Sequence, residues 1–476
     1  MFRDYELDGA FDEMFLAPGK ARPHFNELFQ QLKSIEAETL GHRQSAVEKS
    51  FMDQGITFTV YGDEGSIERI FPTDCLPRII PAKEWEQIEA GLTQRLQAIN
   101  LFLSDVYHEE KIILDGIVPR ELIYNNKHYR REMRGVRVPH DVYVNVCGSD
   151  LIRDADGQYR ILEDNLRVPS GASYMLVNRE IIRRSFPAMY RNYNVRGVEH
   201  YGRELLNMLK SLTPLSGDDP TIVLLTPGVY NSAYFEHAFL AQQMGVPLVE
   251  GRDLVTHDNK VYMRTTDGLT RVDVIYRRVD DDFIDPVIFR RDSMLGVPGL
   301  MNAYRAGNIA IANALGTGVA DDKALYAYLP RIIKYYLDEE PILQNVETYL
   351  CREDKGLQYT LDRLEDLVVK AVGESGGYGM LIGPHASKSE IEAFRSAIKA
   401  EPANYIAQPT LNFSRGPCIV ENGVEARHVD LRPFLLHGEN ARLIPGGLTR
   451  VALRRGSLVV NSSQGGGSKD TWVLDE

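Results

Sequence analysis

The spacing of apolar residues predicts a long helix in the first quarter of the chain. Within residues 83–108, apolar side chains recur every three or four positions, at Trp85, Ile88, Leu92, Leu96, Ile99 and Leu103. This is the period of a helix with one buried face. Because such a stripe belongs to a hydrophobic core more often than to a cofactor site, we expect this segment to form a core helix.

Residues 221–251 alternate between short apolar runs and a helical segment. TIVLLTPG reads as a strand, FEHAFLAQQMG as a helix and VPLVEG as a second strand. The order strand, helix, strand favours a parallel sheet. The loop TPGVYNS lacks the G-x-G-x-x-G pattern of dinucleotide-binding proteins. The pattern therefore predicts a Rossmann-like unit without that fingerprint.

Residues 385–411 predict a capped helix followed by a strand. In HASKSEIEAFRSAIKAE, Ser387 stands three residues before Glu390. This spacing is a capping box, in which each side chain bonds the other residue's backbone N–H at the start of a helix. The following NYIAQPTL reads as a strand.

The glycine-rich segment 368–383, VVKAVGESGGYGMLIG, fits two incompatible signatures. Gly373-x-Ser375-x-Gly377 matches the nucleophile elbow of serine hydrolases, whereas Lys370 ahead of a glycine-rich loop is typical of a phosphate-binding site. An elbow needs a helix directly after the serine, but YGMLIG reads as a second strand. A hairpin with a glycine loop can bring backbone N–H groups close to phosphates; the alternative is a plain hairpin with a solvated lysine.

A second predicted hairpin, within residues 142–171, carries two carboxylates. Asp156-Gly157 is a strong signal for a two-residue loop. Counting outward from this loop places Asp150 directly across from Glu163, with Cβ atoms roughly 4.5–5.5 Å apart. Asn165 projects from the same face as Glu163. In another register, the two acids would never meet and would face solvent.

The facing carboxylates predict a cation site. At a separation of about 4 Å and an effective dielectric constant of about 20, two such charges repel by about 4 kcal/mol, so the arrangement calls for a proton or a cation between them. Two carboxylates and a carboxamide oxygen suit Mg²⁺, which takes its remaining ligands from water and phosphates. Together with the lysine and the glycine loop, they imply a nucleoside triphosphate.

Composition and charge exclude several classes of function. The chain has 476 residues and a net charge of −13, which disfavours a nucleic-acid partner because such binding draws on clusters of Lys and Arg. The four cysteines lie far apart in the sequence, so neither a zinc site nor a disulfide framework is predicted. No apolar run is long enough to span a membrane. We expect a cytoplasmic protein.

Four longer blocks of sequence add a family resemblance to these local patterns. They are ILEDNLRVPSGASYMLVNR, NALGTGVADDKALYAYLP, VVKAVGESGGYGMLIGP and GGLTRVALRRGSLVVNSSQGGGSKDTWV. Over roughly residues 55–476, the chain resembles the circularly permuted ATP-grasp family (type 2) related to glutathionylspermidine synthase. In ordinary ATP-grasp enzymes the lysines precede the metal-binding acids, whereas here they follow. The resemblance implies an α/β (α+β) fold: an ATP-grasp fold in circularly permuted order with a Rossmann-like β-α-β domain.

The resemblance also implies a role for individual residues. Family members hold Mg²⁺ with acidic and amide side chains, contact the phosphates of ATP with lysines, cover them with a glycine flap and place a hinge-strand residue beside adenine. The matching positions are, in that order, Asp150, Glu163 and Asn165; Lys323 and Lys370; Gly376, Gly377 and Gly379; and Gln408.

The family reaction implied is that of an ATP-dependent carboxylate–amine ligase. A substrate carboxylate attacks the γ-phosphate, and an amine then displaces phosphate from the acylphosphate. The chain departs from glutathionylspermidine synthase at Gly148, where that enzyme carries an arginine, so the transition-state cation must come from elsewhere. Arg167 and Arg278 are the candidates. The amidase half of some relatives is missing, so spermidine and glutathione are not implied as substrates.

Domain boundaries and partners follow from the same patterns. We expect an N-terminal region with the carboxylate hairpin (1–215), the Rossmann-like domain (216–312) and an ATP-binding part with lysines, flap and hinge strand (313–476). Charged residues in 277–292 suggest a polar small-molecule or peptide substrate with a carboxylate and an amine acceptor. Family relatives occur beside an all-helical protein and a transglutaminase-like protease, which are candidate partners.

Two other functions compete with the ligase reading. One is an ATP-binding scaffold or regulatory subunit without ligase activity. The other is a serine hydrolase that uses Ser375 with Asp430 and His437, which follow in the chain order of α/β-hydrolases. No helix is predicted directly after Ser375, which argues against the hydrolase. A hydrolase function would also leave the carboxylate hairpin unexplained.

Overall fold

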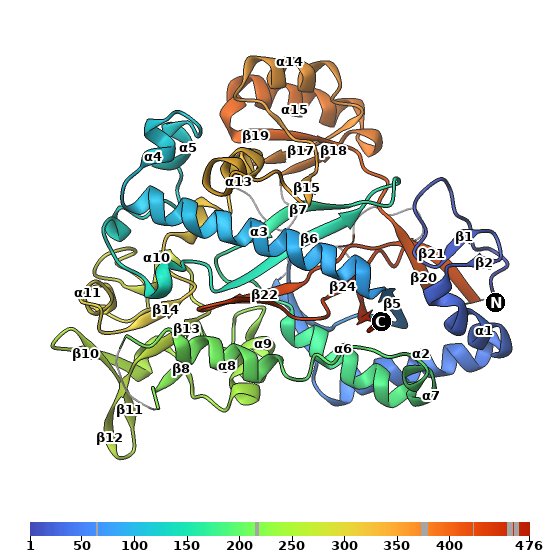
Figure 1. Cartoon of the computed structure of the whole chain (residues 1–476), viewed down its shortest axis with the longest axis horizontal. Coiled ribbons are helices and arrows are strands. Elements are labelled where there is room, and N and C mark those ends of the chain that lie inside the picture. The colour runs from blue at the N-terminus through green and yellow to red at the C-terminus, as the bar shows by residue number, and fades with distance from the viewer. Residues whose placement is uncertain (63–64, 215–218, 373–378, 422, 455–459, 461–465) are drawn as a thin grey trace.

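The core helix expected from the sequence is α3 (Ala82–Tyr107), which crosses the centre of the computed structural model (Figure 1). The structure describes residues 1–476 except 63–64, 215–218, 373–378, 422, 455–459 and 461–465. The apolar stripe of α3 is buried as predicted, since Trp85, Ile88 and Leu103 are at most 1% exposed.

Helix α3 packs on a five-stranded sheet with the strand order β15-β7-β6-β22-β23. Arg95 on α3 forms a buried ion pair of 2.6 Å with Asp164 on β7. The central strand β6 pairs antiparallel with β7 on one side and β22 on the other. The strands are β6 (Val146–Arg153), β7 (Tyr159–Asn165), β15 (Gln344–Asn345), β22 (Phe434–His437) and β23 (Ala441–Leu443).

The predicted Rossmann-like unit is confirmed as a four-stranded sheet in which all neighbours are parallel, with the order β14-β13-β8-β9. Helix α9 (Tyr234–Met244) connects β8 to β9 and provides the crossover that parallel strands need. The strands are β8 (Ile222–Leu225), β9 (Leu248–Val249), β13 (Val274–Arg277) and β14 (Ala310–Ala312). A smaller antiparallel sheet follows β9 in the chain and consists of β10 (Leu254–His257), β11 (Lys260–Thr265) and β12 (Gly268–Val272).

The two strands that flank the glycine loop form an antiparallel pair within a third sheet, with the order β16-β19-β17-β18. The predicted order strand, glycine loop, strand is therefore confirmed, and the residues after the loop form β18 rather than a helix. The capping box is confirmed at the start of α15 (Lys388–Ala400), where Ser387 and Glu390 bond each other's backbone N–H groups. The strands are β16 (Tyr349–Leu350), β17 (Leu367–Ala371), β18 (Met380–Ile382) and β19 (Tyr405–Pro409).

The two ends of the chain share a further sheet. Strand β25 (Gly467–Val473) lies between β24 (Thr449–Val451), with which it is antiparallel, and β5 (Thr73–Ile80), with which it is parallel. Strands from 1–215 and from 313–476 thus share both this sheet and the central one, while the Rossmann-like sheet lies within 216–312. The three domain boundaries stay a prediction.

The remaining elements surround these sheets (Figure 1). The strands are β1 (Phe15–Ala17), β2 (Lys20–Ala21), β3 (Thr57–Gly62), β4 (Gly65–Ile70), β20 (Arg415–Val420) and β21 (Gly423–His428). The helices are α1 (Asn26–Ser34), α2 (Ala37–Asp53), α4 (Lys111–Leu114), α5 (Arg120–Tyr124), α6 (Ala172–Ser185), α7 (Pro187–Arg191), α8 (Tyr201–Ser211), α10 (Asp281–Ile284), α11 (Leu300–Arg305), α12 (Lys323–Tyr326), α13 (Leu329–Leu337) and α14 (Asp354–Asp362).

Two expectations from composition can be compared with this fold. All four cysteines are buried free thiols, in agreement with the absence of a disulfide pattern. Among the described residues, no helix is both long enough and apolar enough to cross a membrane.

Candidate active site

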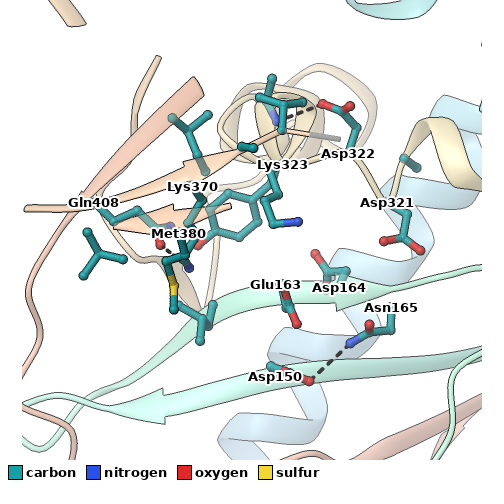
Figure 2. A pocket seen from close by; sticks show the side chains of 18 of the residues that line it. Asp150, Glu163, Asp164, Asn165, Asp321, Asp322, Lys323, Lys370, Met380 and Gln408 are labelled. Atoms are coloured by element: carbon teal, nitrogen blue, oxygen red, sulfur yellow. Dashed lines mark hydrogen bonds between the residues drawn. The ribbon is translucent and has the colours of Figure 1, made fainter. Parts of the chain in front are cut away.

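A cleft of ≈ 1280 Å³ opens between the central sheet and the sheet that carries the glycine loop. Its wall combines acidic, basic and amide side chains from segments far apart in the sequence, several of which are drawn in Figure 2. Those from the central sheet and its loops include Asp150, Glu163, Asn165, Arg167 and Arg432, and those from elsewhere include Asp321, Lys323, Lys370, Gln408 and Arg450.

The carboxylate hairpin brings Asp150 opposite Glu163, as predicted, but by another route. The loop is not the expected two residues, because Arg153 pairs with Tyr159 and the Asp154 backbone N–H donates to the Gln158 carbonyl at 3.0 Å. A three-residue loop forms instead, with Gly157 at φ +80°. A β-bulge between Asp150 and Leu151 then restores the predicted pair. The longer loop shifts the strand register by one residue, and the bulge shifts it back by one residue.

A row of charges crosses three neighbouring strands at this pair. Arg432 Nη2 lies 2.8 Å from Asp150 Oδ2, and Asp150 in turn faces Glu163. The register of β22 against β6 explains the first contact, because Phe434 pairs with Gly148 and Leu431 bridges to Leu151. Sequence analysis missed Arg432. Its only local signal is the alternation of Asp430, Arg432 and Phe434, which does not indicate that the partner strand is β6.

The environment drives the pKa values of the two acids apart. Burial raises the pKa of Asp150 well above its usual range, and the charge of Glu163 adds to this, although Arg432 opposes it. Burial also acts to raise the pKa of Glu163, but the positive charges of Arg432, Lys370 and Lys323 outweigh it, and the pKa lies below its usual value. Of the two acids, Asp150 is thus the one whose neutral form the site favours.

The donor set fits a small hard cation. Asn165 lies beside the pair and donates through Nδ2 to Asp150 Oδ1 at 3.2 Å. In the described part of the chain, no three His, Cys, Asp or Glu side chains lie close enough together to hold a metal ion. A cation here would therefore use the two carboxylates and complete its coordination with Asn165, water or a substrate oxygen. This is how Mg²⁺ is usually bound in proteins.

The two predicted phosphate-binding lysines reach the same cleft from different elements (Figure 2). Lys323 begins α12, and Lys370 lies in β17. Lys370 Nζ donates to Gln408 Oε1 at 2.7 Å, and Gln408 Nε2 donates to Thr348 Oγ1 at 2.9 Å. Burial lowers the pKa of Lys370, the charge of Lys323 lowers it further, and Glu163 opposes both.

The glycine flap is only partly described. Gly379 has φ +65° at the end of the loop. Ser375, Gly376 and Gly377 lie outside the described residues, so their predicted roles remain predictions.

Of the two arginines expected from the sequence, only Arg167 lines the cleft. Its guanidinium donates to Asp321 and Asp280, at 3.2 Å each. Arg278 is 4% exposed and is not part of the cleft wall; it pairs with Glu236 at 3.1 Å. Arg450 joins the wall beside Arg432. Burial and the charge of Arg432 lower the pKa of Arg450 to about 10.

The two residues proposed as hydrolase partners of Ser375 have other contacts. Asp430 Oδ2 accepts from Arg432 at 3.1 Å, while the His437 ring lies 3.2 Å from Asn100 Nδ2. In the described part of the structure, no hydrogen bond joins Asp430 to His437. The contacts thus give no support to a catalytic triad.

Sequence comparisons connect this cleft to known proteins. Residues 77–452 match the family model described as circularly permuted ATP-grasp type 2. An uncharacterized protein from Synechocystis is 53% identical over 473 residues, which cover 99% of this chain and 98% of that protein. An uncharacterized protein from Mycobacterium tuberculosis H37Rv is 51% identical over 466 residues, covering 98% of this chain and 84% of the relative.

More distant matches include a named enzyme and a solved structure. A Frankia casuarinae protein named "Putative glutamate--cysteine ligase 2-2" is 41% identical over 466 residues, but the match covers only 53% of its length. A glutathione synthetase-like effector from Globodera pallida superposes with a TM-score of 0.58 at 12% identity, over 92% of this chain and 98% of the effector. At this identity, the effector supports the fold alone.

Proposed function

Because the chain belongs to the circularly permuted ATP-grasp type 2 family, we propose that it is an ATP- and Mg²⁺-dependent ligase that joins a carboxylate to an amine through an acylphosphate. The observation that carries the proposal is the facing pair Asp150 and Glu163, which shares one cleft with Lys323, Lys370 and Arg432. Carboxylates, a carboxamide and positively charged side chains in one cleft suit phosphoryl transfer. In that reaction the protein mainly positions the reacting groups and neutralises their charge.

In this proposal, Asp150, Glu163 and Asn165 hold Mg²⁺. When bound, the ion neutralises the β- and γ-phosphate charges. The low pKa of Glu163 keeps its carboxylate ionised for this role. Burial raises the pKa of Asp150, and a bound ion would favour its ionised form, since metal ligands must be deprotonated.

The two lysines and the glycine flap bind the phosphates of ATP. Lys370 is fixed by Gln408, so its ammonium group is oriented before the nucleotide arrives. Gln408 lies on the hinge strand β19, which we assign to the side of the base. Gly379 already adopts positive φ and would act with Gly376 and Gly377. The cleft volume of ≈ 1280 Å³ exceeds that of common single-ligand pockets, about 300–1,000 Å³, and leaves room for a second substrate.

The chemical step needs a cation where negative charge develops. We assign this role to Arg432, because it lies 2.8 Å from Asp150 and lines the cleft from the segment just before β22. Arg167, two residues beyond β7 in the cleft wall, would orient the carboxylate substrate. The carboxylate oxygen attacks the γ-phosphorus and ADP leaves; the amine nitrogen then attacks the acyl carbon and phosphate leaves.

The substrate pair is not identified by the relatives. The Frankia casuarinae protein carries the name of a ligase that joins glutamate to cysteine, a carboxylate–amine reaction of the proposed class. The match covers about half of that protein, so its printed activity does not assign glutamate or cysteine to this chain. A small-molecule or peptide carboxylate and a separate amine remain the proposed substrates, and the all-helical and protease partners remain predictions.

Product analysis tests the proposal. With ATP, Mg²⁺ and candidate carboxylates, hydroxylamine should trap the acylphosphate as a hydroxamate, with ADP and phosphate released in equal amounts. AMP and pyrophosphate would instead indicate an adenylate and would overturn the assignment. Tight binding of Mg·ATP without turnover across a broad panel of acids and amines would favour the scaffold alternative.

A further inference from the structure

The Rossmann-like sheet has a topological switch point next to the cleft. In the order β14-β13-β8-β9, the chain passes from β8 outward to β9 and then returns to the other side of β8 with β13 and β14. In open parallel sheets, ligands bind outside the carboxyl ends of the strands at the place where the order reverses. Here that place lies between the carboxyl ends of β8 and β13.

The chain's own segment 166–171, which follows directly on β7, lies at this switch point. Arg278, one residue beyond β13, donates through Nη1 to the Pro169 carbonyl at 2.7 Å. Glu236, in the first turn of α9 after β8, accepts through Oε2 from the Gly171 backbone N–H at 2.6 Å. Arg278 and Glu236 also pair with each other at 3.1 Å, and their side chains are only 2% and 1% exposed. The segment is thus bound through both its carbonyl and N–H groups, as a peptide ligand would be.

A third strand end holds the same region. Asn313, one residue beyond β14, accepts through Oδ1 from the backbone N–H groups of Asn145 and Val146, at 2.9 and 2.8 Å. Its Nδ2 donates to the carbonyls of Val146 and Leu166, at 2.8 Å each. The Asn313 carboxamide thus uses its oxygen and both N–H groups to connect the start of β6 to the residue after β7. These two strands carry Asp150 and Glu163.

We propose that the carboxyl edge of the Rossmann-like sheet binds segment 166–171 in place of a ligand, so that Arg278, Glu236 and Asn313 are positioning residues of the cleft. The segment carries Arg167 and begins next to Asn165, so fixing it also fixes one side of the cation site. This inference rests on the proposed function for its effect on ATP, but the clamping itself can be measured without a substrate.

The clamp also accounts for Gly148. A Cβ atom at this position would lie 3.2 Å from Pro169 Cβ and 3.7 Å from the Phe434 ring. Pro169 is held in place by Arg278, so a side chain at position 148 would require the segment to move. Arg432 supplies a cation to the cleft from the segment just before β22 instead.

The test compares two buried arginines that each pair with a carboxylate. Arg278→Lys removes the fork that spans Pro169 and Glu236 while keeping the charge. Arg179→Lys is the matched control, because Arg179 and Asp470 form a pair of 2.8 Å with both side chains 1% exposed, and Arg179 does not contact the segment. Hydrogen exchange of peptides covering 166–173 should quicken at least tenfold in Arg278→Lys and stay unchanged in Arg179→Lys. Both variants should lower the melting temperature by a similar amount, but only Arg278→Lys should weaken Mg·ATP binding, by about tenfold.

The outcomes separate this inference from the proposed function. If the two variants change hydrogen exchange and Mg·ATP binding equally, Arg278 acts only as one member of a buried ion pair. The clamp would then be wrong. If Arg278→Lys does not fold, Glu236→Gln provides the same comparison, since it turns one acceptor toward Arg278 into a donor. A wild-type protein that fails to bind Mg·ATP would overturn the proposed function, and faster exchange of 166–173 in the variant would still support the clamp.

Discussion

Asp150 has an oppositely charged neighbour on one side and a like-charged neighbour on the other. Arg432 holds one of its oxygens at 2.8 Å, and Glu163 faces it across the hairpin. Burial favours the neutral form of Asp150, whereas a bound cation would favour its ionised form. The two predictions at this scale each change one member of the row.

Replacing Glu163 with Gln should weaken Mg²⁺-dependent ATP binding about tenfold or more, because it removes one charge at nearly constant shape. The melting temperature should fall modestly, because Arg432, Lys370 and Lys323, whose charges lower the pKa of Glu163, lose this counter-charge. Calorimetric titration of ATP over a range of Mg²⁺ concentrations provides the measurement. Glu121→Gln is the control, because Glu121 is an exposed acid on the rim of the same cleft. An identical Mg²⁺ dependence in Glu163→Gln and wild type would rule out Glu163 as a ligand.

Replacing Arg432 with Lys should leave ATP binding within a few-fold but reduce ADP formation about a hundredfold, since the charge remains and its two-armed contact to Asp150 and Asp430 is lost. Arg442→Lys on the neighbouring strand β23 is the control, because Arg442 is 55% exposed and pairs with Glu204. Steady-state rates and ATP affinities would be compared. A loss of affinity without a loss of rate would contradict the transition-state role.

At the scale of elements, sequence patterns identified the local structures and missed what joins them. The helix α3, the parallel unit around α9, the capping box of α15 and both hairpins follow from periodicity and turn residues, because those signals lie within a few residues of the structure they determine. The loop of the carboxylate hairpin is one residue longer than predicted, and the compensating bulge at Asp150 has no local signal. Arg432 was missed for a different reason. Its partner strand lies far away in the chain, and pairing over such distances depends on tertiary packing.

Gly157 in that hairpin loop should be the least replaceable residue of the hairpin. Gly157→Ala forces a side chain into a left-handed conformation, which costs about 1–2 kcal/mol, and its Cβ would lie 2.8 Å from the Phe11 ring. Gly116→Ala isolates the conformational part, because Gly116 has φ +72° and nothing within 4 Å of an added Cβ. Denaturant unfolding should give the larger loss for Gly157→Ala. Equal losses would show that the Phe11 contact is unimportant.

At the scale of the whole molecule, the first and last parts of the chain complete each other's sheets. Strand β25 fills the gap between β24 and β5, and it carries Trp472, which is 0% exposed, and Asp470, the partner of Arg179. The central sheet likewise needs β22 beside β6 and β23 beside β22. The sequence resemblance implied this permuted arrangement, although no local pattern indicates which strands are neighbours.

Removal of residues 446–476 should therefore prevent the N-terminal part from folding, because it deletes β24 and β25, leaves β5 without its neighbouring strand and leaves the buried Arg179 without its counter-ion Asp470. Deletion of Asp475 and Glu476 alone is the control, since both are exposed. Circular dichroism and thermal unfolding would compare the two proteins. A cooperative transition near the wild-type temperature in the longer deletion would contradict the interdependence of the two ends.

The charge row across β22, β6 and β7 also sets the order in which the site can be made during synthesis. The ribosome delivers Asp150, Glu163 and the segment after β7 early, then the whole Rossmann-like sheet, and Arg432 only near the end. At about 5–20 residues per second, the acids wait on the order of tens of seconds for their counter-charge. The two acids therefore stay without this counter-charge until translation is nearly complete, in a chain that still lacks β22 and β23.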